Sequence, residues 1–185
     1  MSTYTSFSSD GHTARWLTWD GGHDETLTLL WENEGWTASG TVGREQVQYV
    51  LRLSPTWHVR QFILFRDLDE PDLWLATDGA GRWGEMNGAH RVELDGCLDV
   101  SLDITPFTAT IPIRRLPLHV GHTADITTLR IDVETLDVQP DHQRYTRLDT
   151  HRWATTRLET GDMVEFDVDE HGLVLDQPGR FRRSL

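Results

Sequence analysis

The sequence contains no lysine, so all 17 of its basic residues are arginines. Cys97 is its single cysteine, which excludes an intrachain disulfide and a zinc site built from several cysteines. A lone cysteine is typical of proteins from a reducing compartment, and we predict a cytoplasmic location. No run of apolar residues approaches the ~20 that a membrane-spanning helix needs, and the first residues show no export signal. We therefore expect a protein that is neither exported nor inserted in a membrane.

Positive charge is also scarce. The 30 acidic residues outnumber the arginines and give a formal net charge of -13. Non-specific binding to nucleic acid or to an anionic membrane surface depends on clustered positive charge, so neither is expected here. Arginine pairs bidentately with carboxylates and phosphates, but biased genome composition explains the missing lysine as well, and both explanations stay open. The charge favours partners that are neutral, cationic or enclosed by the protein.

Hydrophobic residues alternate with polar ones through most of the chain, which is typical of half-buried β-strands. The clearest segments are residues 27–31, 47–53, 98–104, 129–133 and 164–168. Turn sequences separate them, including Asp20-Gly21-Gly22, Asp78-Gly79, Asp95-Gly96 and His171-Gly172. No segment keeps an apolar period of 3.6 long enough to predict a helix. We predict one all-β domain over residues 1–185, antiparallel and closed or nearly closed into a barrel or roll, because closure removes exposed sheet edges.

Two pairs of short matches indicate an internal duplication. "DGAGRW" at residues 78–83 and "DQPGRF" at residues 176–181 share the pattern Asp-x-x-Gly-Arg-aromatic at an offset of 98 (176 − 78). Tyr49 and Trp57 have the same spacing as Tyr145 and Trp153, at an offset of 96 (145 − 49). Matches between short strands rich in Trp, Asp and Gly also arise by chance, so both origins stay open. A duplication would give two similar halves, about 1–95 and 96–185.

The glycines of "DGAGRW" have two interpretations. A phosphate-binding loop needs a strand before it and a helix after it, whereas the sequence that follows, "GEMNGAHRVELDG", is typical of turns and strands. In the second copy, Pro178 also removes a backbone N–H donor. We therefore predict a pair of corners, in which Gly81 and Gly179 allow a sharp bend while Trp83 and Phe181 close an end of the barrel.

Residues 94–116, "LDGCLDVSLDITPFTATIPIRRL", carry the densest group of chemically active side chains. As a strand, its first half places Asp99, Ser101 and Asp103 on one face, with neighbours about 6.6 Å apart. Two carboxylates at such a distance suit glycoside hydrolysis, which uses separations of roughly 5 to 9.5 Å, but a solvated strand face is the simpler interpretation. Arg114 and Arg115 are adjacent, so on a strand they point to opposite sides, and one faces inward. An inward arginine needs a partner, and Asp99, Asp103 or an anionic ligand group are the candidates.

The same segment resembles a known bacterial family, named "Putative glycolipid-binding". The motifs that carry the resemblance are "LDGCLDV" at residues 94–100, "TPFT" at 105–108 and "IPIRRL" at 111–116. Further matches follow the family's order: "WHVR" at 57–60, "DGAGRW" at 78–83, "QRYT" at 143–146 and "GLVLDQPG" at 172–179. The resemblance covers most of the chain.

This resemblance implies an all-β spiral β-roll, likened to carriers that hold lipid groups inside a curved sheet, with no established reaction. Three positions depart from the family's pattern. Ser101 stands where aspartate is usual, Ala109 where asparagine is usual, and Gln177 where tyrosine is usual. If those positions bind a head group, this protein binds differently, and an enzyme that relies on paired aspartates at 99 and 101 is disfavoured.

The sequence gives little support for a metal site or for a catalytic cysteine. His119 and His122, with His142 and His151 downstream, are the possible metal ligands, but His-x-x-His does not place both rings on one face of a strand. We expect exposed histidines, no metal site and no cofactor. The neighbours Asp95 and Asp99 raise the pKa of Cys97, so we expect an inert, buried thiol rather than a nucleophile.

Three functions from different classes remain. The preferred one is non-enzymatic binding of a glycolipid or other lipid-like small molecule in the β interior, as a carrier or sensor. Its expected ligand-binding residues are Trp57, Arg60, Trp74, Trp83, Arg114, Arg115 and Tyr145. The first alternative is a hydrolase that acts on a glycosylated or acylated small molecule through Asp99 and Asp103. The second is a scaffold with a protein partner, whose mark is a large exposed apolar patch. The sequence leaves the oligomeric state open.

Overall fold

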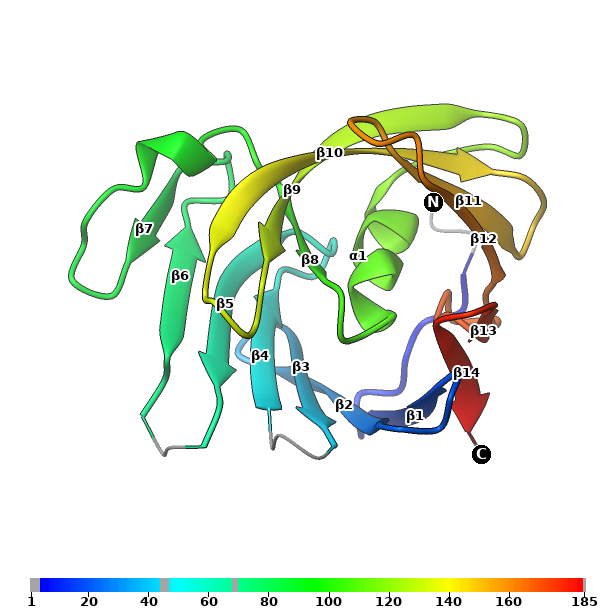
Figure 1. Ribbon diagram of the computed structural model, residues 1–185, viewed down its shortest axis with the longest axis horizontal. Helices are drawn as coiled ribbons and strands as arrows, with labels where there is room; N and C mark the ends of the chain where they lie inside the picture. The colour runs from blue at the N-terminus through cyan, green and yellow to red at the C-terminus, as the bar shows by residue number, and fades with distance from the viewer. Residues whose placement is uncertain (1–3, 44–46, 68–69, 185) are drawn as a thin grey trace.

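Two β-sheets, one α-helix and a short 3-10 helix make up the part of the chain that the structure describes, residues 4–43, 47–67 and 70–184. The structure is a computed structural model. In Figure 1 the smaller sheet arches over helix α1 (Phe107–Arg115), and the larger sheet lies on the other side of this helix. The arrangement confirms the predicted all-β class and its description as a partly closed roll.

The larger sheet is antiparallel and has nine strands, in the spatial order β13-β14-β1-β2-β3-β4-β5-β6-β7. Its strands are β1 (His12–Thr18), β2 (Asp24–Glu32), β3 (Gly35–Val42), β4 (Val47–Leu53), β5 (Val59–Phe65), β6 (Leu73–Thr77), β7 (Trp83–Glu85), β13 (Asp176–Gln177) and β14 (Phe181–Ser184). Strands β1 to β7 follow one another as a meander. The C-terminal hairpin joins the sheet beside β1, where Thr18 pairs with Phe181.

The smaller sheet has five strands in the order β12-β11-β10-β9-β8. They are β8 (Asp99–Leu102), β9 (Thr123–Ile131), β10 (Val138–Arg147), β11 (Arg152–Arg157) and β12 (Met163–Asp167), and the 3-10 helix η1 (Val92–Leu94) precedes them. Strand β8 is parallel to β9, and the other pairs are antiparallel. A parallel neighbour requires a crossover connection, and α1 lies in that connection between β8 and β9.

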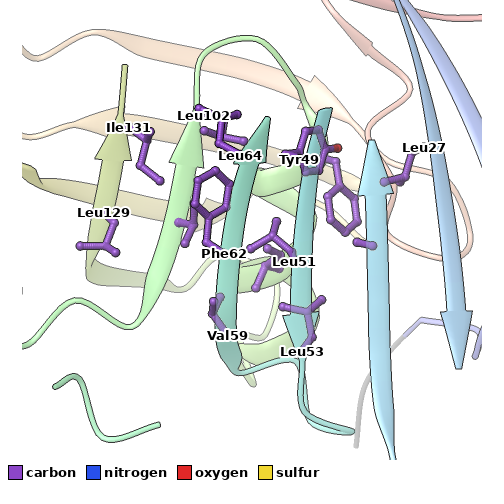
Figure 2. Close-up of a cluster of buried hydrophobic side chains, with 14 of the residues drawn as sticks. Leu27, Tyr49, Leu51, Leu53, Val59, Phe62, Leu64, Leu102, Leu129 and Ile131 are labelled. Carbon is purple, nitrogen blue, oxygen red and sulfur yellow. The ribbon is translucent and has the colours of Figure 1, made fainter. Parts of the chain in front are cut away.

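The main core lies where the two sheets face each other. Phe62 and Leu64 of β5 pack in one cluster with Leu102 of β8 and with Leu129 and Ile131 of β9, as Figure 2 shows. All five side chains are buried because both sheets turn an alternating apolar face toward this contact. The predicted alternation in β4 is likewise confirmed, since every second residue from Val47 to Leu53 is buried.

Helix α1 was not predicted from the sequence. Six of its nine residues are buried: Phe107, Thr108, Thr110, Ile111, Pro112 and Ile113. A helix covered on nearly all sides shows no amphipathic stripe, so the period of 3.6 is absent from its sequence. The expectation that Arg114 and Arg115 lie on a strand is therefore wrong. Within the described residues, no helix is long and apolar enough to cross a membrane.

Strand β8 also differs from its prediction. Residues 98–104 were expected to bury Leu98 and expose Asp99, but Leu98 is exposed and Asp99 is fully buried. The strand has protein on both faces, as parallel strands in such crossovers usually do, so alternation does not separate an inner from an outer face. Asp103 lies beyond the end of the strand, in a turn.

The internal duplication is not confirmed. All seven strands before residue 95 lie in the larger sheet, whereas the later strands are divided between the two sheets. The two predicted corners do share their backbone chemistry: Gly81 has φ +91° and Gly179 has φ +79°, values that favour glycine. The aromatic residues that follow, Trp83 and Phe181, are both buried and both begin a strand.

Candidate functional site

A cavity of about 390 Å³ lies between the smaller sheet, the N-terminal end of α1 and the β13–β14 hairpin. We call it the roll cavity. Its apolar wall comes mainly from Val100, Leu102 and Val164, and most of its other lining side chains are polar. Strands β8, β10, β11 and β12 contribute to it together, because the curl of the smaller sheet turns their inner faces toward α1.

Tyr145 of β10 lines this cavity. The residue is only 3% exposed, and burial raises the pKa of its phenol well above the ordinary value, with a smaller contribution from the charge of Asp99. No described residue forms a hydrogen bond with the Tyr145 hydroxyl. Buried tyrosine hydroxyls usually have a partner, so this group is available to a molecule inside the cavity.

Four charged side chains line the roll cavity: Asp103, Asp162, Arg157 and Arg180. Asp103 lies among three arginines, with nitrogen-to-oxygen distances of 2.8 Å to Arg130, 3.4 Å to Arg180 and 3.8 Å to Arg157. Partial burial acts to raise the pKa of Asp103, but the hydrogen bond and charge of Arg130 and the charges of Arg180 and Arg157 outweigh it, so the pKa is lowered. The carboxylate is therefore ionised at neutral pH.

A hydrogen-bonded chain fixes the β10 side of the cavity. The Asp141 carboxylate, whose side chain is 4% exposed, accepts hydrogen bonds from Arg157 Nε at 3.3 Å and from Gln143 Nε2 at 2.8 Å. Gln143 Nε2 also donates to Ser101 Oγ at 3.4 Å. These bonds hold an amide, a guanidinium and a hydroxyl toward the same space, so the cavity offers both donors and acceptors without large rearrangement.

A second buried group lies behind the cavity wall. The carboxyl oxygen Oε1 of Glu25 accepts hydrogen bonds from Tyr49 at 2.6 Å and from Thr105 at 2.7 Å, while its Oε2 is buried without a partner. Burial raises the pKa of Glu25 to about 7, although the bonds from Tyr49 and Thr105 oppose the shift. Thr105 also lines the roll cavity and so connects this carboxyl to it. Sequence reasoning missed Glu25, although it stands two residues before Leu27 on the same face of β2.

Asp99 and Arg115 form a buried ion pair, which is one of the pairings that the sequence left open for an inward arginine. Arg115 Nε donates to Asp99 Oδ1 at 3.2 Å, and a second nitrogen of the guanidinium binds the other oxygen. Burial raises the pKa of Asp99, and the charge and hydrogen bond of Arg115 oppose the shift. Asp99 is absent from the cavity lining. The geometry gives the hydrolase hypothesis no support, because Asp99 is enclosed and paired while Asp103 lies in a turn among other arginines.

Arg114 and Trp57, two of the predicted ligand-binding residues, contact each other rather than the roll cavity. The Arg114 guanidinium carbon lies 4.6 Å from the Trp57 ring centroid and 4.8 Å from that of Phe7. Arg114 also donates to the backbone oxygen of Thr5 at 3.1 Å and to that of His171. Burial lowers the pKa of Arg114 to about 10. This cluster fastens the N-terminal segment and the turn at His171 to the end of α1.

The other predicted ligand-binding residues lie away from the roll cavity. Arg60 donates to the backbone oxygen of Asp78 at 3.2 Å and lines a separate groove of about 480 Å³. Trp74 is half-buried on β6. Trp83 is buried, and its indole N–H donates to the backbone oxygen of Cys97 at 2.9 Å. Of the seven predicted residues, Tyr145 alone lines the roll cavity.

The cysteine and the histidines were weighed in the sequence as a possible nucleophile and as possible metal ligands. Cys97 is buried, and burial together with the charges of Asp95 and Asp99 raises the pKa of its thiol to about 11. The rings of His119 and His122 lie 5.7 Å apart, edge to face. Across residues 4–43, 47–67 and 70–184, no group of three or more His, Cys, Asp or Glu side chains has the placement to hold a metal ion.

Comparison with known proteins matches residues 13–183 to a family model described as "Putative glycolipid-binding". The chain belongs to this family. The crystal structure of a DUF1089 family protein from Pseudomonas aeruginosa superimposes with a TM-score of 0.71 at 32% sequence identity, and the match covers 100% of this chain and 97% of that one. No curated protein matches.

Three positions that the sequence resemblance singled out share a location. Ser101, Ala109 and Gln177, which were expected to differ from the family's usual residues, all line the roll cavity. Ser101 and Ala109 lie on the consecutive elements β8 and α1, whereas Gln177 of β13 is far from both in the sequence. The fold therefore brings Gln177 to the same cavity as the other two.

Proposed function

We propose that the protein binds an amphiphilic small molecule without transforming it, and that the neutral, hydroxylated head group of this molecule occupies the roll cavity. The single observation that carries the proposal is Tyr145, whose side chain is buried and lines the cavity and whose hydroxyl has no hydrogen-bond partner among the described residues. The family description supports a glycolipid or a similar lipid-like molecule as the ligand class.

The balance of the lining supports a hydroxylated head group in particular. Gln143, Gln177, Arg157 and Arg180 offer donors, while the carboxylates and amide oxygens of the same lining offer acceptors. A hydroxyl group donates and accepts at once, so a sugar or another polyol satisfies both kinds of group, whereas a simple anion satisfies the donors alone. A carrier or a sensor fits such a site better than an enzyme, because the hydrolase pair is not assembled.

Native mass spectrometry of protein purified without detergent tests the proposal directly. A co-purifying amphiphile with a hydroxylated head group is the expected result, and cytoplasmic expression, which the single cysteine favours, provides the sample. Binding of n-octyl β-glucoside, measured below its critical micelle concentration by calorimetry, supplies a defined probe.

Tyr145→Phe is the informative variant, because it removes the hydroxyl and leaves the ring. It is expected to weaken binding of n-octyl β-glucoside by about 2- to 10-fold, the effect of one hydrogen bond. Tyr4→Phe serves as a control, since Tyr4 is also buried but does not line the cavity. Unchanged affinity in Tyr145→Phe, or no binding of the glucoside by the wild-type protein, contradicts the proposal.

A further inference from the structure

A second cavity, of about 310 Å³, adjoins the roll cavity. We call it the side cavity. We propose that it holds the apolar chain of the same amphiphile, so that the ligand passes the ion pair of Asp103 and Arg180 with its head group on one side and its chain on the other. The proposal rests on the proposed function, because it concerns the chain of a ligand whose head group occupies the roll cavity.

Continuity of the two cavities is the first observation behind this proposal. Asp103 and Arg180 belong to the linings of both. Arg180 Nη2 lies 3.4 Å from an Asp103 carboxylate oxygen and 3.3 Å from the Asp103 backbone oxygen. One ion pair therefore forms the boundary between the two spaces.

The second observation is the contrast in lining. The side cavity is walled by Val42 and Val47 from the larger sheet, by Val133 beyond β9, by Ile104 and by Phe181 of β14. Aliphatic and aromatic side chains from distant segments thus meet at one space, next to a cavity with mostly polar walls. Thr18, His23 and Glu134 also line the side cavity, together with Asp103 and Arg180 at its boundary. Apolar area removed from water stabilises a bound chain, and the five apolar side chains supply that area.

The boundary is able to open at little cost. Both side chains are well exposed, 41% for Arg180 and 46% for Asp103, and ion pairs between exposed groups contribute little net free energy. Asp103 keeps its contact with Arg130 at 2.8 Å when Arg180 turns aside, so its charge stays compensated. The Arg180 guanidinium carbon also lies 5.5 Å from the centroid of the Phe181 ring. This contact with the apolar wall does not depend on Asp103.

The size of the side cavity fits a chain of the same molecule better than a separate ligand. Its volume corresponds to about ten water molecules at their liquid volume, which suits a short stretch of hydrocarbon. A carboxylate and a guanidinium lie where the two cavities join, and an independent apolar molecule would form no hydrogen bond with either group. An amphiphile places its polar linkage at that point and hydrogen-bonds to both groups.

A series of alkyl β-glucosides tests the proposal. Methyl, hexyl and octyl β-glucosides share one head group, and all are measured below their critical micelle concentrations. In the wild-type protein, affinity is expected to rise by up to about threefold for each added methylene that becomes buried. Methyl β-glucoside reports on the head-group site alone, by ligand-observed NMR.

Filling the side cavity provides the decisive comparison. Ile104→Trp places a bulky ring in it from a half-buried loop position, and Val133→Phe does so from another segment, which guards against failure of one variant to fold. Both are expected to bind methyl β-glucoside within twofold of wild type and to lose the increase from methyl to octyl. Leu158→Trp, at an exposed position outside both linings, is expected to keep the wild-type increase.

The outcomes separate the two proposals. If the filled variants keep the full dependence on chain length, the chain lies elsewhere and the side-cavity proposal is wrong, while head-group binding stands. If methyl β-glucoside and its longer homologues all fail to bind the wild-type protein, the proposed function and the side-cavity proposal are both wrong.

Discussion

The carboxyl group of Glu25 is enclosed between strands β2 and β4 and the segment that leads into α1. Its pKa is raised to about 7 in the folded protein, mainly by burial, from an ordinary value of 4.5. The folded state therefore holds a proton that the unfolded state releases between pH 4.5 and pH 7, so this group's stabilisation is complete below pH 4.5 and is lost as the pH rises to about 7. The difference of about 2.5 between the pKa values (7 − 4.5) corresponds to about 3 kcal/mol.

Glu25→Gln removes this titration and keeps the acceptor for Tyr49 and Thr105. We expect the free energy of unfolding of the wild type, relative to that of the variant, to fall by about 3 kcal/mol between pH 4.5 and pH 7.5. Urea unfolding of both proteins at several pH values measures this difference in the free energy of unfolding. Groups other than Glu25 titrate in both proteins, so their contributions cancel. Exposed Glu159→Gln is the control and should show no such trend. A difference that is constant with pH would show that Glu25 titrates normally.

Gly40 of β3 lies directly opposite Tyr49 in the sheet. A Cβ atom at this position would stand 2.2 Å from two atoms of the Tyr49 ring, which is fully buried and held by the hydrogen bond from its hydroxyl to Glu25. Gly40→Ala is therefore expected to lower the free energy of unfolding by about 1–3 kcal/mol, as overpacked cores do. Gly22→Ala is the control, since its nearest neighbour is the flexible Asp20 carboxylate at 3.2 Å. Equal denaturation midpoints for the two variants would contradict this packing.

Among the secondary-structure elements, β8 and α1 depend on each other through one buried contact. Arg115 at the end of the helix is the ion-pair partner of Asp99, and their side chains are 11% and 0% exposed. Arg115→Ala leaves a buried charge without its partner, and we expect a loss of about 3–5 kcal/mol in the free energy of unfolding. The double variant Asp99→Leu/Arg115→Met is expected to recover most of this loss, because it removes both charges.

An exposed pair offers the matched control for that experiment. Asp125 and Arg144 pair across β9 and β10 with both side chains about half exposed, so Arg144→Ala should change the urea midpoint little. If Arg115→Ala unfolds at the same urea concentration as Arg144→Ala, the buried ion pair does not hold β8 and α1 together. If the double variant is less stable than Arg115→Ala, the charges themselves stabilise the protein.

The same elements show what alternation in a sequence predicts and what it does not. Strand β4 has one face in the core and one outside it, so its pattern predicted both the strand and its inward side chains. Strand β8 and helix α1 are enclosed on several sides, and enclosure removes the contrast on which periodicity depends. The inward arginine was predicted from alternation on a strand, and its need for a partner from charge. The segment is a helix instead, and only the helix shows that Arg115 pairs with Asp99 while Arg114 lies over Trp57.

At the scale of the whole molecule, the candidate site depends on how the two sheets meet. Tyr145 was predicted as a ligand-binding residue, and it lies in the roll cavity. The tryptophans were also expected there because they are large and amphipathic, yet Trp57 and Trp83 are buried in contacts with other parts of the protein. Gln143, Arg157 and Arg180 are separated by up to 37 residues (180 − 143), and only the curl of the smaller sheet and the β13–β14 hairpin bring them to one space.

Substituting the three cavity residues that the sequence resemblance singled out tests whether the roll cavity decides what this protein binds. The combined variant Ser101→Asp, Ala109→Asn and Gln177→Tyr adds volume and one charge to the cavity lining. We expect it to fold and to bind n-octyl β-glucoside at least tenfold more weakly, about 1.4 kcal/mol, because the added atoms occupy the space of the head group. Ser39→Asp with Gln48→Tyr makes similar changes on exposed positions of β3 and β4 and should leave calorimetric affinity unchanged. Equal affinities for the combined variant and the wild type would place the binding site outside the roll cavity.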